Sequence, residues 1–354
     1  MTDTPLVSVV IATYNRADLL SESVRSVLSQ DYPSVELLIV DDCSTDRTPE
    51  LIAELEARDE QVRGIRLPDN SGPSAARNMG IASARGSLVA FLDDDDIWLP
   101  GKLTAQVRTL QDNPEAALCY AKALVGTADG VATVQPYSGS HLGRNGDNFE
   151  NQLRHHAIKT PTVVVRKSVL EEVGVFDETL ATGEDTDLFL RITLQHPATY
   201  VPEPVTVVRE HRGRMTLGDR RSGRRARCLL EVFGRIWDRL PASRESARGL
   251  IAAHLVAAAL TLAECEKGET LACEEIRDIT QAHPEWFDFP EPFWPLALAY
   301  AASGGDREAR AAARETVKQP RMGRLKRAAA WALYIWPRPV AWLKSHIENR
   351  QLAE

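Results

Sequence analysis

The sequence predicts an α/β domain built on a largely parallel sheet, followed by an all-helical domain. Over the first 120 residues, short β-branched runs alternate with amphipathic segments, which is the pattern of strand and helix units around such a sheet. From about residue 218 the composition becomes rich in Ala, Leu and Arg at helical spacing, with almost no strand signal. The length of 354 residues also fits two domains of roughly 150 residues each. We therefore expect one domain over residues 1–217 and a second over residues 218–354.

The first two strand and helix units carry clear start signals. Residues 6–13 and 35–42 are nearly continuous apolar runs, which predict buried strands. Asn15 is expected to cap the first helix. The apolar face of that helix consists of Leu20, Val24, Val27 and Leu28. Thr48 followed by Pro49 predicts the start of the second helix.

The other elements of the α/β part are assigned by the same patterns. Further strands are expected at residues 62–67, 87–92, 160–170 and 203–211. Further helices are expected at residues 74–84 and 183–197. A turn is expected at Gly174. These assignments leave a Gly-rich, polar stretch beyond residue 120 without predicted elements.

Composition excludes several classes of protein. Lys and Arg number 42 against 50 Asp and Glu, a net charge of −8, which argues against a nucleic-acid-coating protein. The five cysteines contain no C-x-x-C pair, so we expect neither a zinc site nor a disulfide framework, and a reducing compartment. The N-terminus lacks a basic signal-peptide region, and no run approaches the ~20 apolar residues of a membrane span. We expect a cytoplasmic protein that binds no nucleic acid.

The helical domain leaves two questions open. Segments around Gly268 and Gly305 share an Ala four positions later and a Pro 15 or 16 positions later, which fits either tetratricopeptide-like hairpins or an ordinary helical bundle. Residues 321–350 combine seven basic residues and one acid with aromatic side chains. This segment fits peripheral contact with an anionic membrane at its inner face. It fits equally a helix packed on its own domain or on a second subunit of a homodimer.

Acidic side chains follow two of the predicted strands. The four consecutive aspartates Asp93, Asp94, Asp95 and Asp96 end one strand, and their repulsion requires compensation by a cation, a base or water. Mg²⁺ or Mn²⁺ would take such oxygen ligands. Asp41 and Asp42 end another strand, where a carboxylate can accept a hydrogen bond from a nucleotide base or cap the next helix. The alternative to a cation site is that the four aspartates form a solvated acidic turn.

Other common chemistries lack their motifs. The sequence contains no G-x-G-x-x-G after the first strand and no G-x-x-x-x-G-K-[ST]. It contains no G-x-S-x-G and no H-E-x-x-H. The phosphate grips of dehydrogenases and P-loop NTPases, and the common serine hydrolase and zinc protease sites, are therefore not expected.

Four motifs in order give the sequence a specific likeness. They are VSVVIATYNR, VELLIVDDCSTD, GPSAARNMGIASARGSLVAFLDDDDIWLPGKL and GEDTDLFLR. Over residues 5–215 the sequence resembles the family 2 glycosyltransferases, which implies a GT-A fold, Rossmann-like with a mostly parallel sheet, and an inverting, metal-assisted transfer from a nucleotide-sugar. The resemblance implies UDP-sugar as donor and Mn²⁺ or Mg²⁺ as cofactor.

The resemblance also implies roles for individual residues. Donor contacts are expected from Thr13, Tyr14, Arg16, Asp41, Arg77, Asp93 and Asp94, with Asp41 reading the uracil base and Asp42 bracing its turn. Metal ligation is expected from Asp95, Asp93 and His211. The resemblance assigns Asp185 as catalytic base, with Glu184 and Asp187 as alternatives. Asp96 is either part of this site or a structural carboxylate.

The expected function is a hexosyltransferase acting on a hydroxyl of a glycan, a lipid-linked sugar, a natural product or another small molecule, with the helical domain binding the acceptor or a partner. A second hypothesis is a peptide glycosyltransferase modifying Ser or Cys through a tetratricopeptide-like domain. A third, from a different class, is a non-catalytic nucleotide-binding scaffold.

Overall fold

The computed structural model describes residues 4–127, 132–211, 223–244, 246–251, 254, 255 and 258. The chain divides into two compact units, Met1–Arg214 and Met215–Glu354. The sequence predicts this boundary at residue 217. Each unit is described below by itself.

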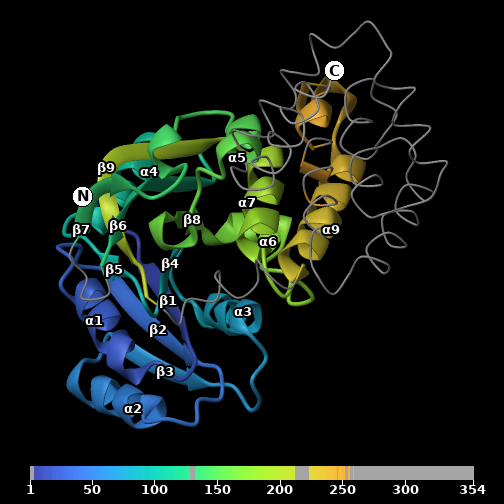
Figure 1. The fold of residues 1–354 in the computed structure, drawn as a ribbon. Helices are drawn as coiled ribbons and strands as arrows, with labels where there is room; N and C mark the ends of the chain where they lie inside the picture. Colours follow the sequence, from blue (N-terminus) through green and yellow to red (C-terminus); the bar gives the residue numbers. More distant parts are fainter. Residues whose placement is uncertain are drawn as a thin grey trace, which may run out of the picture. The chain divides into compact units, whose positions relative to one another are not determined.

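The first unit begins with four strands that lie in one half of its sheet. They are β1 (Val7–Thr13), β2 (Val35–Asp41), β3 (Val62–Arg66) and β4 (Leu88–Asp93). They are mutually parallel in the order β3-β2-β1-β4 (Figure 1). The helices that connect them are α1 (Ala17–Leu28), α2 (Thr48–Arg58) and α3 (Pro73–Ser83). Within residues 6–92 every expected strand and helix is present.

The second half of the sheet is mixed, which corrects the expectation of a mostly parallel sheet. Its strands are β5 (Ile97–Trp98), β6 (Leu118–Gly126), β7 (Ala132–Pro136), β8 (Val164–Arg166) and β9 (Ala198–Arg209). The described sheet has nine strands in the order β3-β2-β1-β4-β8-β6-β9-β5, with β7 beside β6. β8 runs antiparallel to both β4 and β6, whereas β6 and β9 are parallel. A parallel half and a mixed half thus meet between β4 and β8.

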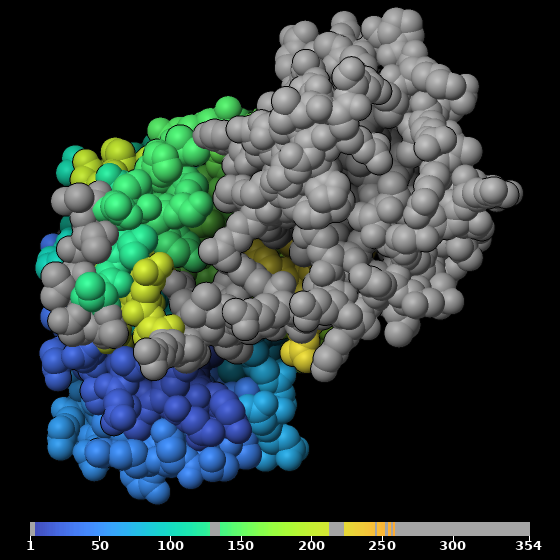
Figure 2. Space-filling view, viewed as in Figure 1, coloured from blue at the N-terminus to red at the C-terminus, as the bar shows by residue number. Residues whose placement is uncertain are grey.

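Helices accompany this second half. They are α4 (Lys102–Asp112), α5 (Phe149–His155), α6 (Lys167–Val173) and α7 (Glu184–Gln195), with short 3-10 turns η1 (Ser140–Leu142) and η2 (Thr160–Thr162). The strand expected over residues 160–170 is only partly right, because η2, β8 and the start of α6 share that stretch. Figure 2 shows the blue N-terminal segments at one end of the unit and the green middle segments at the other.

The sheet is buried on both faces, as its continuous apolar strands require. One face of β1, with Val9 and Ile11, packs in a cluster with α1, α2 and α4. The other face, with Val10, packs in a cluster with α3, α6 and α7. At Gly80 of α3 an added Cβ would lie 2.4 Å from Val10 Cγ1, so the helix approaches the sheet as closely as a glycine allows. This packing fixes where each strand ends.

Asn15 does not cap α1, which corrects the expectation from the sequence. Arg16 is the N-cap residue and makes no side-chain cap. Asn15 has φ +53 and sends its side-chain oxygen to the loop after β2. The amide groups of that loop are its donors, so Asn15 serves the contact between two loops instead of the helix.

The described part of the second unit is helical. It contains α9 (Arg224–Arg239) and the 3-10 turn η3 (Ala242–Arg244). Phe233 stacks on His254 with ring centroids 4.4 Å apart. Within the described residues, no helix is both long enough and apolar enough to cross a bilayer. The tetratricopeptide-like segments and the basic aromatic segment at 321–350 lie outside the described residues.

Candidate active site

The ends of three parallel strands bring the acidic residues together. In the sheet register Thr13 pairs with Asp41, and Ala12 pairs with Asp93. The carboxyl ends of β1, β2 and β4 therefore lie side by side. The chain leads from β1 to β2 on one side and from β3 to β4 on the other side of β1. The ends of β1 and β4 therefore form the switch point at which open α/β sheets bind ligands.

Asn15 ties the loop after β1 to the loop after β2. Its Oδ1 accepts hydrogen bonds from the backbone N–H of Thr45 at 2.7 Å and of Asp46 at 3.2 Å. Its own N–H donates to Ser44 Oγ at 2.9 Å. Between these anchored residues and the sheet, Tyr14 keeps 43% of its surface exposed. Tyr14, which directly follows the last residue of β1, is therefore accessible to solvent.

Asp41 and Asp42 are both buried and both engaged. Asp41 accepts the Ser44 N–H at 2.9 Å and pairs with Arg66 Nη1 at 2.6 Å. Asp42 accepts the N–H groups of Ser71 at 2.7 Å and Gly72 at 2.8 Å, so it braces the turn before α3. The assignment of Asp41 to a nucleotide base stays a prediction.

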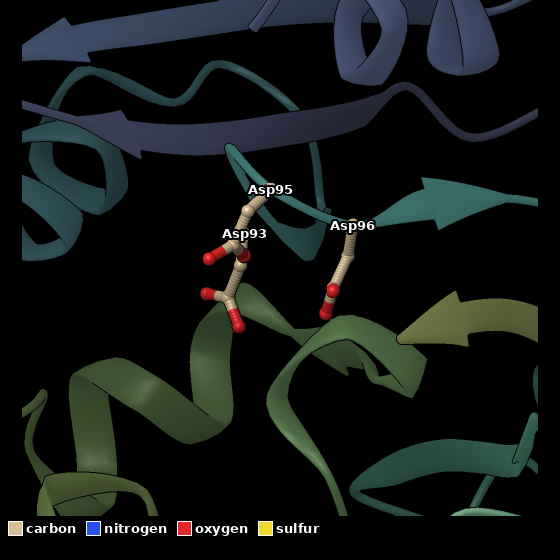
Figure 3. A group of neighbouring side chains, drawn as sticks. All are labelled: Asp93, Asp95 and Asp96. Atoms are coloured by element: carbon tan, nitrogen blue, oxygen red, sulfur yellow. The ribbon is translucent and has the colours of Figure 1, made fainter. Parts of the chain in front are cut away.

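The turn after β4 gathers three carboxylates. Oxygen atoms of Asp93, Asp95 and Asp96 lie within 4.8 Å of one another (Figure 3). Carboxylate oxygens this close repel each other unless a cation lies among them. The donor set is all oxygen, as hard divalent cations prefer, so the residues present fit Mg²⁺ or Mn²⁺.

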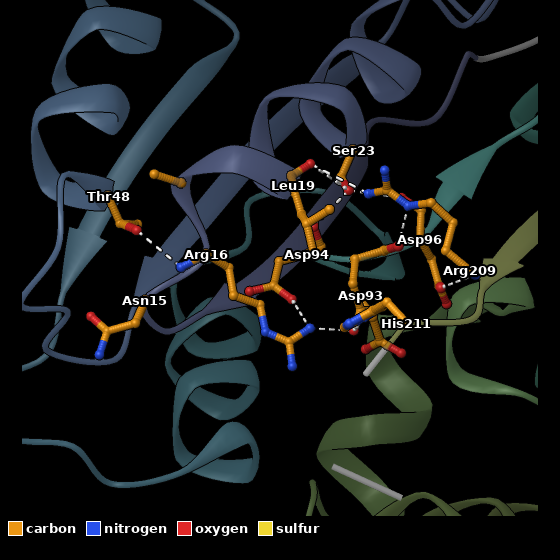
Figure 4. Close-up of polar contacts among 12 residues, drawn as sticks. Asn15, Arg16, Leu19, Ser23, Thr48, Asp93, Asp94, Asp96, Arg209 and His211 are labelled. Carbon is orange, nitrogen blue, oxygen red and sulfur yellow. Dashed lines mark hydrogen bonds and ion pairs between the residues drawn. The ribbon is translucent and has the colours of Figure 1, made fainter. Parts of the chain in front are cut away.

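Side chains of helix α1 bind the main-chain atoms of this turn. The Ser23 hydroxyl lies 2.8 Å from the carbonyl oxygen of Asp94 and 2.7 Å from that of Asp96 (Figure 4). Ser26 Oγ accepts the Trp98 N–H at 3.1 Å, and Gln30 Nε2 donates to the Leu99 carbonyl at 3.0 Å. The turn is therefore held by α1 and by Gln30, two residues beyond its end.

Arg209, at the end of β9, clamps the same turn from the other side. It is fully buried, and its backbone N–H donates to Asp96 Oδ1 at 3.0 Å. Its guanidinium donates to the carbonyl oxygen of Asp95 and pairs with Glu22 of α1. Two residues later, His211 Nε2 lies 3.0 Å from Asp95 Oδ2. Asp96 thus belongs to the acidic cluster, and its Oδ1 also accepts a hydrogen bond that holds the end of β9.

Arg16 lies on the acidic turn as well. Its Nη1 lies 3.5 Å from Asp94 Oδ1 (Figure 4). The same atom forms a closer ion pair with Asp95 Oδ2. Burial lowers the pKa of Arg16, but the charges of Asp94 and Asp95 outweigh it, so the net pKa is raised. Burial raises the pKa of Asp94 to about 7, with Arg16 opposing and Asp95 adding to the rise. Thr13, only 3% exposed, lies beside Asp94 and is covered instead of facing solvent.

Arg77 joins the acidic turn to the start of α7. Its Nη2 lies 2.8 Å from Asp93 Oδ1, and its Nη1 lies 2.9 Å from Glu184 Oε1. The guanidinium also lies over the ring of Phe176, 5.3 Å from its centroid. Burial lowers the pKa of Arg77, but the two carboxylates raise it above its ordinary value. Arg77 is therefore a permanent cation between two acidic segments.

The three carboxylates at the start of α7 differ in their partners. Glu184 pairs with Arg77, and burial raises its pKa despite that partner. Asp187 is buried and pairs with Arg191 at 2.7 Å. Asp185 is half-buried, and within the described part of the chain its Oδ1 accepts hydrogen bonds from the N–H and the hydroxyl of Thr186. Of the three, Asp185 is the one held without a cationic partner there.

The structure brings most of the expected residues to one edge of the sheet. Those brought together by contacts are Arg16, Arg77, Asp93, Asp94, Asp95 and His211, with Asp185 next to Glu184. Sequence reasoning missed Ser23, Glu22 and Arg209. Ser23, Ser26 and Gln30 recur at helical spacing beside the apolar stripe of α1, a signal that could have revealed them. The partners of Arg209 are fixed only by tertiary structure.

Solved structures share this fold. Staphylococcus aureus TarS 1-349 in complex with UDP-GlcNAc aligns with a TM-score of 0.60 and 17% identity, over 94% of this chain and 89% of that one. A mannosyltransferase from Pyrobaculum calidifontis, in complex with GDP-Man and Mn²⁺, aligns with a TM-score of 0.52 and 20% identity, over 95% and 89%. The first unit therefore has the GT-A-type α/β fold, with an acidic site at its strand ends.

Sequence relatives narrow this to a family. Residues 8–174 match the model of Glycosyl transferase family 2. The putative colanic acid biosynthesis glycosyl transferase WcaA of Escherichia coli is 30% identical over 210 residues, 59% of this chain and 73% of WcaA. The putative teichuronic acid biosynthesis glycosyltransferase TuaG of Bacillus subtilis is 44% identical over 108 residues, 30% of this chain and 43% of TuaG. The chain belongs to glycosyl transferase family 2.

For most of these relatives the match covers only part of their length. The chain spans 34% to 53% of the length of the first five curated relatives.

Proposed function

We propose that this chain transfers a sugar from a nucleoside diphosphate sugar to a hydroxyl group of an acceptor, with inversion at the anomeric carbon. The observation that carries the proposal is the bridge of Arg77 between Asp93 and Glu184. This bridge joins the acidic turn, the proposed cation site, to the start of α7, which also carries Asp185, the proposed base. Membership of family 2 supports the same reaction.

Asp185 is the proposed base. The acceptor oxygen attacks the anomeric carbon while Asp185 takes its proton, and the bond to the diphosphate breaks as the new glycosidic bond forms. Asp187 is less suited because Arg191 occupies its carboxylate, and Glu184 because Arg77 does. Within the described residues, Asp185 is thus the carboxylate of this helix start best placed to accept a proton.

The acidic turn is the proposed cation site. Asp93 and Asp95 would hold Mn²⁺ or Mg²⁺, with His211 beside Asp95. The cation would supply positive charge for the departing diphosphate. The chain's own contribution is to hold the turn, since Ser23 and Arg209 bind its main-chain carbonyl oxygens and Arg77 pairs with the Asp93 carboxylate.

UDP-sugar is the proposed donor and a bacterial surface glycan the proposed acceptor. The donor choice is supported by the TarS complex with UDP-GlcNAc, and the GDP-Man complex of the mannosyltransferase makes a GDP-sugar the competing choice. Tyr14, exposed directly after the end of β1, offers an aromatic face on which a base can stack. The acceptor is proposed from the names of the relatives, which refer to colanic and teichuronic acids.

The test is a stability panel on the full chain with UDP, GDP, dTDP and CDP, each with and without Mn²⁺. A ligand that binds only the folded state raises the unfolding temperature. We expect a Mn²⁺-dependent rise for UDP that disappears in Asp95→Asn, together with slow release of UDP from a UDP-sugar. If UDP raises the unfolding temperature while no sugar is released from the UDP-sugar, even with a panel of hydroxyl acceptors supplied, the result would instead support a nucleotide-binding scaffold.

A further inference from the structure

Arg16 and His211 contact the same oxygen atom of Asp95. Arg16 Nη1 forms a close ion pair with Asp95 Oδ2, and His211 Nε2 lies 3.0 Å from that atom. Arg16 also lies 3.5 Å from Asp94 Oδ1. The guanidinium therefore lies where the acidic turn concentrates its negative charge (Figure 4).

These side chains are sheltered from solvent. The exposed fractions are 20% for Arg16, 11% for Asp95 and 15% for His211. Charges that are sheltered in this way are screened weakly, so both attraction to Asp95 and repulsion between cations are strong. A guanidinium and a divalent cation cannot both approach Asp95 Oδ2 closely at low energy.

The backbone of Arg16 is fixed while its side chain is long. Its N–H donates to Thr48 Oγ1 at 3.3 Å, and its carbonyl oxygen accepts the N–H groups of Leu19 and Leu20. The start of α1 thus anchors the residue. Rotation of side-chain bonds is enough to carry the guanidinium away from Asp95 without moving the loop.

We propose that Arg16 and the divalent cation are alternative occupants of Asp95. Arg16 neutralises the acidic turn until the cation binds, and cation binding displaces its guanidinium. This inference rests on the proposed function, in which Asp95 is a cation ligand. The displaced guanidinium is then available to the oxygens of the donor diphosphate, which an arginine fork fits well. Cation alone consequently binds more weakly than the carboxylates themselves would allow.

The experiment measures Mn²⁺ affinity of the full chain by calorimetry without any nucleotide. Arg16→Gln is expected to bind Mn²⁺ about tenfold more tightly than the wild type, the factor that corresponds to one lost charge-assisted hydrogen bond. Arg16→Lys keeps the charge but not the fork, so its affinity is expected to lie between the two. Arg66→Gln is the matched control, since it removes one cation from Asp41 and leaves the acidic turn intact.

The outcomes separate this inference from the function on which it rests. Asp95→Asn that binds Mn²⁺ as well as the wild type would remove the cation site itself. If Asp95→Asn loses binding but Arg16→Gln binds no more tightly than the wild type, the competition is refuted. Equal tightening in Arg66→Gln would also refute it, because the effect would then be one of overall charge. If Arg16→Gln does not fold, the comparison of Arg16→Lys with the wild type decides alone.

Discussion

Arg209 and Asp96 are 113 positions apart, yet the backbone N–H of Arg209 donates to Asp96 Oδ1 at 3.0 Å. This bond connects the end of β9 to the turn that follows β4. Because the Arg209 guanidinium continues to the Asp95 carbonyl and to Glu22, one buried residue joins a strand, a turn and a helix. His211 reaches Asp95 from the same strand end.

Arg209→Met is expected to destabilise the protein by roughly 3 kcal/mol, because it leaves a carbonyl and a partly buried carboxylate without their donor. The measurement is the urea midpoint of unfolding. Arg235→Met is the matched control, since its pair with Glu231 is half-exposed on α9 and such pairs contribute little. Equal losses in the two variants would contradict the clamp.

Asp185→Asn is expected to lower turnover by about 10² to 10⁴, the usual contribution of a general base, while donor binding changes little. Steady-state turnover and calorimetric donor affinity are the two measurements. Asp187→Asn is the control: its pair with Arg191 is buried, so it should reduce stability while turnover per folded molecule is kept. Unchanged turnover in Asp185→Asn would remove it from the base role.

Arg77→Lys is expected to lower turnover about 10- to 100-fold, the range seen for residues that orient metal-binding groups. A lysine ammonium is a compact point charge and lacks the rigid fork by which Nη1 and Nη2 of Arg77 reach Glu184 and Asp93 at once. Mn²⁺ affinity should fall as well, which a merely structural role elsewhere would not produce. Arg63→Lys, whose guanidinium donates to the Ser83 carbonyl, is the control.

Lys102 is fully buried and lies 4.3 Å from the centroid of the Trp98 ring. Burial lowers the pKa of Lys102 from 10.5 to about 7. Below pH 7 folding buries a charged ammonium, whereas above pH 7 the unfolded chain holds a proton that the folded chain has lost. Stability should therefore rise with pH, by up to about 1.4 kcal/mol per pH unit.

Lys102→Met should remove this rise. The measurement window is pH 7 to about 8.5, where an ordinary thiol stays largely protonated. At higher pH the stability would fall again, because burial raises the pKa of Cys119 to about 12 and the unfolded chain then loses a proton that the folded chain keeps. Urea unfolding at the two ends of the window measures the slope. Lys122→Met, at a half-buried position of β6, should keep the wild-type slope. A wild-type slope retained in Lys102→Met would refute the assignment.

Gly80→Ala is expected to destabilise the protein by about 1 to 3 kcal/mol, the usual cost of overpacking. The new methyl would lie 2.4 Å from Val10 Cγ1, between α3 and the sheet. The control is Gly249→Ala, where an added Cβ meets nothing within 4 Å. In that helix the alanine should be neutral or stabilising. Thermal unfolding distinguishes the two variants.

The first half of the fold could be predicted from the sequence because its signals are local. Continuous apolar runs mark β1, β2 and β4, and Pro49 and Pro73 mark helix starts. The mixed half could not, because β8 has only three residues and the same strand pairs antiparallel on both sides. Such pairing depends on packing between segments that are distant in the sequence, so no hydrophobic periodicity in the sequence indicates it.

The candidate site divides in the same way. The aspartates after β2 and β4 and those at the start of α7 are visible as charged residues at element boundaries. The contact of Arg16 with Asp95 and the side-chain bonds of Asn15 depend on how two loops meet. Asn15 looked like a helix cap because caps and loop contacts use the same amide chemistry.

The hold of α1 on the acidic turn has a consequence for protein engineering. Ser23, Ser26 and Gln30 bind main-chain atoms of residues 94–99, and none of these bonds uses the carboxylates of Asp93, Asp94 or Asp95. Exchange of those three side chains therefore leaves these main-chain bonds to the turn in place. An experimenter can exchange them one at a time for other ligands and test the proposed cation site while the main-chain bonds from Ser23, Ser26 and Gln30 stay in place.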